Sequence, residues 1–300
     1  MKEPGGTLTR RDFLKGATFA TLAATMGLPS ESFAQKQESA RSSRVVLIRH
    51  AEVLGEDGQA DPKITEEMIQ SAMKELFQTE DAEEAWMYLF GPEDIVGIKS
   101  NVWGPLPTPD AVENSIKKGL FSAGVKEENI AIDDRGVLSN EIFKRASAYV
   151  NTRPMRTHHW SGVGGCLKNP IMFTPTPWSY HDNSCADLAK LWEIPLLKDK
   201  VRLNILVMFT PLFHGVGAHH FNAEYTWRYN GLIVGTDPVA VDSTGLSILN
   251  ARRREYFGEE RPIKPPPHHI VFAETRHKLG VSDPSKIDLV KLGWKEGILI

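Results

Sequence analysis

Residues 94–133 read DIVGIKSNVWGPLPTPDAVENSIKKGLFSAGVKEENIAID, and this stretch decides the fold. It begins with an apolar run at residues 94–99 that predicts a strand. A loop rich in glycine and proline leads to apolar residues at helical spacing over 111–123. A short apolar run at 129–133 predicts a second strand. Strand, helix and strand in this order predict a parallel βαβ unit.

The same alternation extends along the chain in both directions. Further strands are expected at 44–49, 202–210, 231–235 and 287–292, and further helices at 66–77, 81–90, 238–250 and 268–279. Thr65 is the expected N-cap of the first of these helices. Residues 151–184, rich in Gly, Pro, His and Trp, predict a long irregular middle segment. The predicted fold class is α/β, with a mostly parallel central sheet and flanking helices, in a single domain over residues 44–300.

Residues 1–34 contain the parts of an export signal. The polar start includes TRRDFLK at 9–15, an apolar run of about 13 residues follows at 16–28, and Ser-Phe-Ala at 32–34 fits a small-residue cleavage site. The paired arginines resemble a twin-arginine (Tat) signal peptide. An amphipathic helix or a membrane anchor is the alternative, but the run is shorter than the ~20 residues that span a bilayer. We expect export by the twin-arginine translocase in folded form, a tether at residues 35–43, and a periplasmic mature chain.

Composition argues against several partners and cofactors. The formal net charge is −3 and no basic run follows the signal, so nucleic acid is not an expected partner. No stretch after residue 35 is long and apolar enough to span a membrane. Cys166 and Cys185 are too few for a cysteine-ligated iron–sulfur cluster or a four-cysteine zinc site. They form either a disulfide or two buried thiols.

Six of the ten histidines gather in two loops. They are His158, His159, His181, His214, His219 and His220. Imidazole is the commonest metal ligand and a proton carrier near neutral pH, and a mononuclear site draws its ligands from separate segments. We interpret His159, His181, His214 and His219 as candidate ligands of a divalent metal ion, and His181 also as a candidate catalytic acid or base. The alternative is that these histidines are hydrogen-bonded structural residues or lie in solvent.

Two lysine–asparagine pairs are candidates for binding an anionic or carbonyl-bearing ligand or cofactor. Lys99 and Asn101 end a predicted strand, and Lys168 and Asn169 lie in the irregular middle segment. Ligands of open α/β sheets bind beyond the carboxyl ends of strands, where such side chains can hold an anion. The alternative is a turn at the strand end, in which the asparagine caps a neighbouring backbone group.

Two acidic residues lie in GTDPVAVD at residues 235–242, which joins a strand to a helix. Asp237 is well placed as the N-cap and Pro238 as the first helical residue. Asp242 falls about one turn later, where a carboxylate interacts favourably with the helix dipole. We also interpret Asp242 as a candidate catalytic residue in a ligand-binding crevice at the ends of the strands.

The segment VVLIRHAE at residues 45–52 is similar to the opening of histidine phosphatases, in which a histidine accepts the phosphoryl group. His50 would be that residue. Ala51 replaces the glycine of the motif, and no matching second half is apparent in the sequence. Phosphoryl hydrolysis through His50 is therefore the third functional option.

Several landmarks appear together in a characteristic order. They are EAW at 84–86, DIVGIKSN at 94–101, Thr-Pro at 108–109, the segment 162–169 ending in LKN, His181, and GTDPVAVD at 235–242. With them, residues 44–292 resemble the family catalogued as domain of unknown function 362. The resemblance implies the fold but no reaction. Many members carry a ferredoxin-like cluster domain, whose cysteines are missing here. The residues that recur in the family pattern are Lys99, Asn101, Lys168, Asn169, His181, Asp237 and Asp242.

These observations predict a crevice formed by the end of strand 94–99, the segment 158–181 and the loop 214–220. We expect it to bind a metal or a small anionic ligand, with the protein acting as an exported enzyme or a cofactor-maturation factor. A non-catalytic periplasmic carrier or assembly protein for exported redox enzymes is the second hypothesis.

Overall fold

The computed structural model describes residues 42–215 and 221–300, and Ser42–Ile300 form one compact unit. The expected export signal and residues 35–41 of the expected tether lie outside the described residues. Within the described part of the chain, none of the helices combines the length and the apolar character that a membrane crossing needs.

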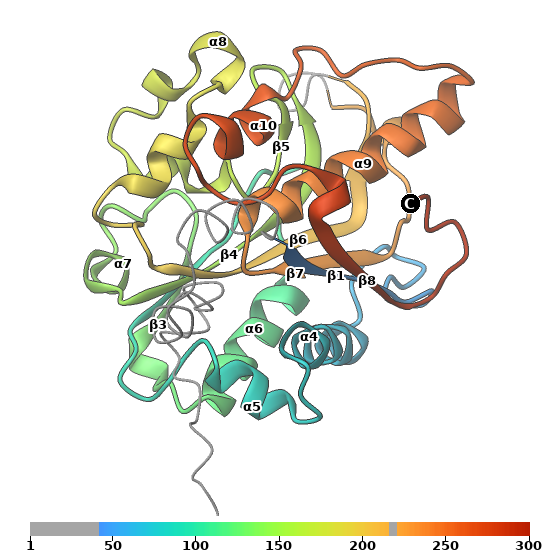
Figure 1. The fold of residues 1–300 in the computed structure, drawn as a ribbon. Coiled ribbons are helices and arrows are strands. Elements are labelled where there is room, and N and C mark those ends of the chain that lie inside the picture. Colours follow the sequence, from blue (N-terminus) through green and yellow to red (C-terminus); the bar gives the residue numbers. More distant parts are fainter. Residues whose placement is uncertain (1–41, 216–220) are drawn as a thin grey trace, which may run out of the picture. The chain divides into compact units, whose positions relative to one another are not determined.

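A central sheet of eight strands organises this unit (Figure 1). The strands are β1 (Ser43–Arg49), β2 (Val96–Lys99), β3 (Ile130–Asp133), β4 (Ala148–His158), β5 (Gly162–Gly164), β6 (Val201–Leu212), β7 (Gly231–Gly235) and β8 (Ile287–Gly293). Their order is β3-β2-β4-β6-β7-β1-β8, with β5 paired to β4. The β3–β2, β2–β4, β4–β6 and β1–β8 pairs are parallel, whereas β7 is antiparallel to β6 and β1. The prediction of an α/β fold with a mostly parallel sheet is confirmed.

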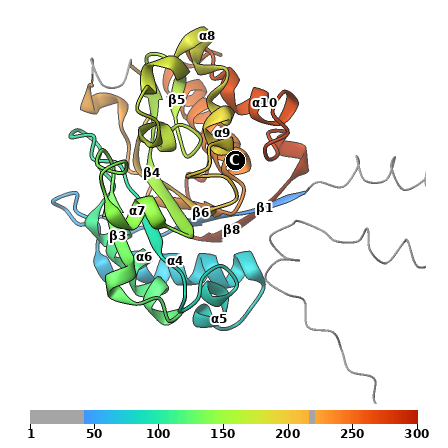
Figure 2. The same ribbon diagram turned by 90° about the vertical axis from the view of Figure 1, so that its left-hand side faces the viewer.

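Helices cover both faces of the sheet. They are α4 (Pro62–Phe77), α5 (Ala82–Met87), α6 (Asp110–Ser122), α7 (Glu141–Arg145), α8 (Asp182–Cys185), α9 (Pro238–Phe257) and α10 (His268–Thr275). Short 3₁₀ turns lie at Glu127–Asn129, Asn169–Phe173, Pro177–Tyr180, Leu188–Glu193, Ala223–Tyr225 and Pro284–Lys286. Seen along the sheet, α4, α5 and α6 lie on one face and α9 and α10 on the other (Figure 2).

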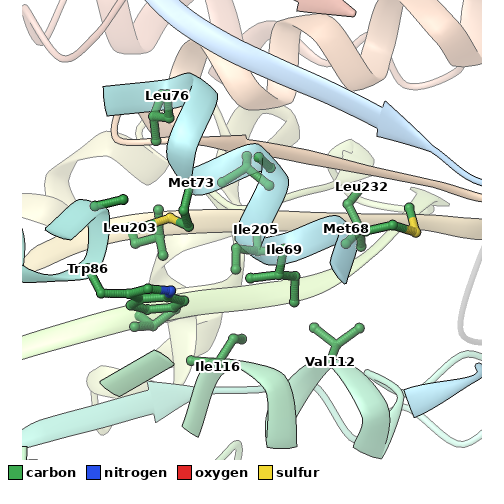
Figure 3. Close-up of a cluster of buried hydrophobic side chains, with 14 of the residues drawn as sticks. Met68, Ile69, Met73, Leu76, Trp86, Val112, Ile116, Leu203, Ile205 and Leu232 are labelled. Carbon is green, nitrogen blue, oxygen red and sulfur yellow. The ribbon is translucent and has the colours of Figure 1, made fainter. Parts of the chain in front are cut away.

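The sheet separates two apolar clusters because its side chains alternate between faces. Along β6, Leu203 and Ile205 pack toward α4 and α6, whereas Leu206 and Met208 pack toward α9. Figure 3 shows the first cluster, in which side chains of α4, α5 and α6, including the fully buried Trp86, gather with Leu203, Ile205 and Leu232 of the strands. This close-packed core fixes the positions of the strand ends.

Two helix termini show how local sequence sets the boundaries. The α4 helix begins at Pro62, with Asp61 as N-cap accepting a hydrogen bond from the Ile64 N–H. The expected Thr65 cap is therefore wrong, because proline suits the first helical position and the preceding Asp satisfies a free N–H. Asp237 caps α9 as predicted, accepting from Val239 and Ala240.

The middle of the chain is more regular than its sequence predicts. Residues 148–158 form the strand β4, and every one of them is buried. The prediction of an irregular segment from 151 onward is wrong in this part, because the strand carries Asn151, Arg153 and Arg156 instead of an apolar run, and it contains Pro154. The proline is accommodated at a shift in the β4–β6 register between Pro154 and Arg156.

Candidate functional site

A cavity of about 230 Å³ lies beyond the carboxyl end of β2 and along the second half of β4. The chain leaves β2 toward β3 on one side and leaves β4 toward β6 on the other, so the two strand ends flank a topological switch point. The last pair between these strands is Lys99 with Asn151, so the second half of β4 extends beyond β2. The cavity is lined by Asn101, Trp103, Asp134, Arg135, Arg153, Arg156, His158, Lys168, Asn169, Ile171, Met172, Pro177 and His181.

The cavity brings together four of the residues that the sequence singles out. Asn101, Lys168, Asn169 and His181 line it. Lys99 is buried beside it, with Nζ 2.5 Å from Asp134 Oδ1 and 2.7 Å from the Ser100 carbonyl. Burial lowers the pKa of Lys99 to about 8, although the carboxylate of Asp134 opposes the shift. Lys99 is thus held by an internal ion pair.

A chain of buried asparagines crosses the floor of the site. Asn151 Nδ2 donates to Asn204 Oδ1 at 2.9 Å, and Asn169 Nδ2 donates to Asn151 Oδ1 at 2.9 Å. Asn101 Nδ2 then donates to Asn169 Oδ1 at 3.2 Å, and Asn101 Oδ1 accepts from Arg156 Nη1 at 3.0 Å. Each amide has its orientation set by the next, so the network fixes the direction of the Arg156 guanidinium.

Two buried arginines face the cavity without a carboxylate in ion-pair contact among the described residues. Arg153 is 3% exposed and Arg156 is 6% exposed. Nη2 of Arg153 and Nε of Arg156 have no hydrogen-bond partner within residues 42–215 and 221–300. Burial, and then the neighbouring charge of Arg153, lower the pKa of Arg156. A guanidinium stays protonated near neutral pH, so the pair places two positive charges at the cavity without a direct ion-pair partner among the described residues.

Aromatic and glycine residues shape the surroundings of these arginines. The Arg156 guanidinium carbon lies 4.2 Å from the centre of the Trp103 ring, a cation–π contact at the cavity wall. A Cβ at Gly164 would lie 2.8 Å from Arg153 Nη2, so glycine makes room for this side chain. Trp160 packs against the ring of His181, with 4.1 Å between ring centres.

Lys168 and His181 form the second polar group of the cavity. Nζ of Lys168 lies 3.1 Å from Nε2 of His181 and 3.7 Å from Sγ of Cys185. Burial lowers the pKa of Lys168 to about 8, with Arg153 and Arg156 adding to the shift. Burial and the Lys168 charge lower the pKa of His181 to about 4. Near neutral pH the imidazole is therefore neutral and can accept a hydrogen bond from the lysine.

Asp242 holds the loop that carries Lys168 and Asn169. It is fully buried and accepts hydrogen bonds from the backbone N–H groups of Cys166 (2.6 Å) and Leu167 (2.9 Å). A Cβ at Gly165 would overlap the Asp242 carboxylate, so the close approach requires glycine. Burial raises the pKa of Asp242 to about 7, against the effect of the two N–H groups and of Arg153. Asp242 does not line the cavity and has the geometry of a positioning residue.

The histidines proposed as metal ligands are dispersed. His181 lines the cavity, whereas His159 and His214 are not among its lining residues and His219 lies outside the described residues. His214 Nδ1 is 3.1 Å from Arg253 Nη1. No group of three or more His, Cys, Asp or Glu side chains in the described ranges is arranged to hold a metal ion. The metal-binding assignment stays a prediction.

The two cysteines form no disulfide. Cys166 and Cys185 are buried free thiols.

The phosphatase-like segment lies at another part of the sheet. His50 follows β1, is not among the lining residues of the cavity, and accepts a hydrogen bond from the Glu52 N–H. The preceding Arg49 is buried and donates to the carbonyls of Tyr229 and Glu296. This arginine is occupied by structural hydrogen bonds.

Sequence reasoning missed five lining residues that carry charge or an aromatic ring. They are Trp103, Asp134, Arg135, Arg153 and Arg156. Arg153 and Arg156 lie in the segment that the sequence predicts to be irregular, so the sequence pattern does not assign them to a strand. The available signal was the position of Asp134 directly after a predicted strand, where a ligand-facing residue is expected in this fold class.

Searches of curated proteins and of solved structures found no match to this chain. A family model gives the one positive comparison, and it covers the part of the chain from β3 into α9. That range contains Asp134, Arg153, Arg156, Lys168 and His181 of the cavity. The family model described as domain of unknown function (DUF362) matches residues 125–247, and this match supports the resemblance of the chain to that family.

Proposed function

We propose that the cavity between the ends of β2 and β4 binds a small organic anion. The observation that carries this proposal is the excess of positive charge. Arg135, Arg153, Arg156 and Lys168 line the cavity, against Asp134 as the lining carboxylate, and Asp134 is already paired with Lys99. An anion would accept hydrogen bonds from the unmet guanidinium groups and offset the cost of burying them.

The geometry favours a planar or tetrahedral oxyanion. Arginine presents a fork of N–H donors that matches carboxylate and phosphate oxygens. Arg153 and Arg156 both line the cavity, and Lys168 adds a third cationic donor there. The volume of about 230 Å³ suits a small ligand and not a nucleotide.

Replacing Arg156 by Gln should weaken anion binding by about tenfold to a hundredfold, because a hydrogen bond to a charged group contributes about 1.5–3 kcal/mol. Titration calorimetry of the wild-type protein and the variant with acetate and with phosphate measures this loss. Arg145→Gln is the matched control. Arg145 is exposed on α7, so this substitution removes the same charge at a place away from the cavity. Equal losses in both variants would mean that net charge, and not the cavity, governs binding.

We also propose that the chain is exported through the twin-arginine pathway and works in the periplasm as an enzyme or a cofactor-maturation factor. The sequence at residues 9–15 and 16–28 supports this part of the proposal. Replacing Arg10 and Arg11 together by Lys should leave the full-length precursor in the cytoplasmic fraction. Cell fractionation with immunodetection checks this, and unchanged export of the double variant would contradict it. Ligand retention without turnover would favour the alternative of a carrier or assembly protein.

A further inference from the structure

We propose that Lys168 forms a Schiff base with the carbonyl carbon of a small oxo acid whose carboxylate binds to Arg153 and Arg156. This inference rests on the proposed anion-binding function and names the ligand class and the reacting atom. The three cationic side chains line one cavity, so a ligand that carries a carboxylate beside a carbonyl would present its carboxylate to the guanidinium groups and its carbonyl carbon to the amine.

Lys168 differs from the other buried lysine of the site in what its amine contacts. Lys99 Nζ is held by the carboxylate of Asp134 and does not line the cavity. Lys168 is 4% exposed and lines the cavity, and its polar neighbours are the His181 imidazole and the Cys185 thiol. Among the described residues no carboxylate forms an ion pair with it. A buried lysine without a counter-ion is a costly arrangement that reactive lysines use.

The charges around Lys168 favour its neutral amine, which is the nucleophile. Burial and the two arginines lower its pKa to about 8. At pH 7 roughly a tenth of the amine is then unprotonated, against about one part in 2,500 for an ordinary lysine with a pKa near 10.4. A nearby cationic group is a recognised way of activating a Schiff-base lysine.

The reaction needs no oxidant or reductant. The lone pair of Nζ forms a bond to the carbonyl carbon while the C=O π pair moves to oxygen, and a proton passes from nitrogen to that oxygen to give a carbinolamine. His181 Nε2, 3.1 Å from Nζ, is placed to relay this proton. The hydroxyl then takes a proton from solvent and leaves as water, while the nitrogen lone pair forms the C=N bond, so the product is a protonated imine. The protonated imine withdraws electrons from the carbon on the side away from the carboxylate, so a proton or an aldehyde can leave that carbon, as enamine formation and aldol cleavage of an oxo acid require.

Borohydride trapping tests the inference on the wild-type protein. The purified mature chain is incubated with pyruvate, reduced with sodium borohydride and analysed by intact mass and peptide mapping. We expect a gain equal to the mass of the probe less one oxygen atom, located on Lys168. Acetone, which has the carbonyl without the carboxylate, should give far less adduct. Lys168→Arg, with its folding checked by a melting curve, should give none at this position.

Two results would overturn the inference in different ways. If the wild-type protein binds acetate or pyruvate in calorimetry but yields no adduct on Lys168, the Schiff base is wrong and the anion site stands. The same holds if the label falls on exposed lysines such as Lys63, whose side chain is 86% exposed. If no anion binds at all, the proposed function fails together with the inference.

Discussion

Asn169→Ala is expected to lower the free energy of unfolding by about 4 kcal/mol, because a buried donor or acceptor left without its partner costs about 1–3 kcal/mol and several are affected. Asn169 Nδ2 lies within hydrogen-bond distance of the Lys99 carbonyl, the Asn151 side chain and the Thr152 carbonyl, at 2.9–3.1 Å. Its Oδ1 accepts from Asn101. The alanine variant removes the side chain that joins the ends of β2 and β4.

Chemical denaturation of the wild-type protein and the variant measures this loss. Asn114→Ala is the matched control, since Asn114 is exposed on α6 and alanine suits a helix interior. We expect a change within about 0.5 kcal/mol for the control. A loss of less than 1 kcal/mol for Asn169→Ala would show that the asparagine chain does not hold the strand ends together.

The second large effect is a loss of stability in acid that depends on His269. This residue is fully buried on α10, and neither ring nitrogen has a hydrogen-bond partner among the described residues. Burial, with the charges of Lys168 and Arg153, lowers its pKa to about 3. Between pH 6.5 and about 3 the unfolded chain binds a proton here and the folded chain does not. The contribution of His269 to the free energy of unfolding is therefore complete above pH 6.5. Between pH 6.5 and about 3 it falls by about 1.4 kcal/mol for each pH unit of acidification.

The variant His269→Leu isolates this contribution, because other titrating groups such as Asp242 act equally in both proteins. Urea denaturation at pH 7.5, 6, 5 and 4 should show a steeper loss for the wild-type protein, with the difference growing by about 1.4 kcal/mol per unit below pH 6.5. At pH 7.5 the variant should be as stable as the wild type or more so, since it removes unpaired buried polar atoms. Parallel curves at all four values would mean that the folded protein protonates His269 as readily as the unfolded chain.

Much of the fold can be predicted from this sequence because most strands are apolar and alternate with helices. The strands near 94–99 and 129–133 and the strand 231–235 were predicted within two residues of their observed bounds. The exceptions are the short β5 and β4, and β4 carries the site. Its burial is stabilised by hydrogen bonds between polar side chains, which have no periodic apolar signature, and Pro154 adds a signal against a strand.

The candidate site was predictable only in part, for the same physical reason. Asn101 and Lys168 were found because they follow a recognisable strand or belong to a recurring motif. Arg153 and Arg156 were missed because their position at the cavity depends on β4 extending beyond the end of β2. The crevice was expected to include the loop 214–220, but the described residue His214 does not line the cavity.

A crystal structure of the protein grown with selenate tests the central claim most directly, because anomalous scattering locates this oxyanion without ambiguity. We predict one selenate per chain in the cavity, with oxygens within hydrogen-bond distance of the guanidinium groups of Arg153 and Arg156, which line it. The same crystals of Arg156→Gln should show a much weaker peak. Selenate bound only at the surface, with ordered water alone beside both arginines, would contradict the account.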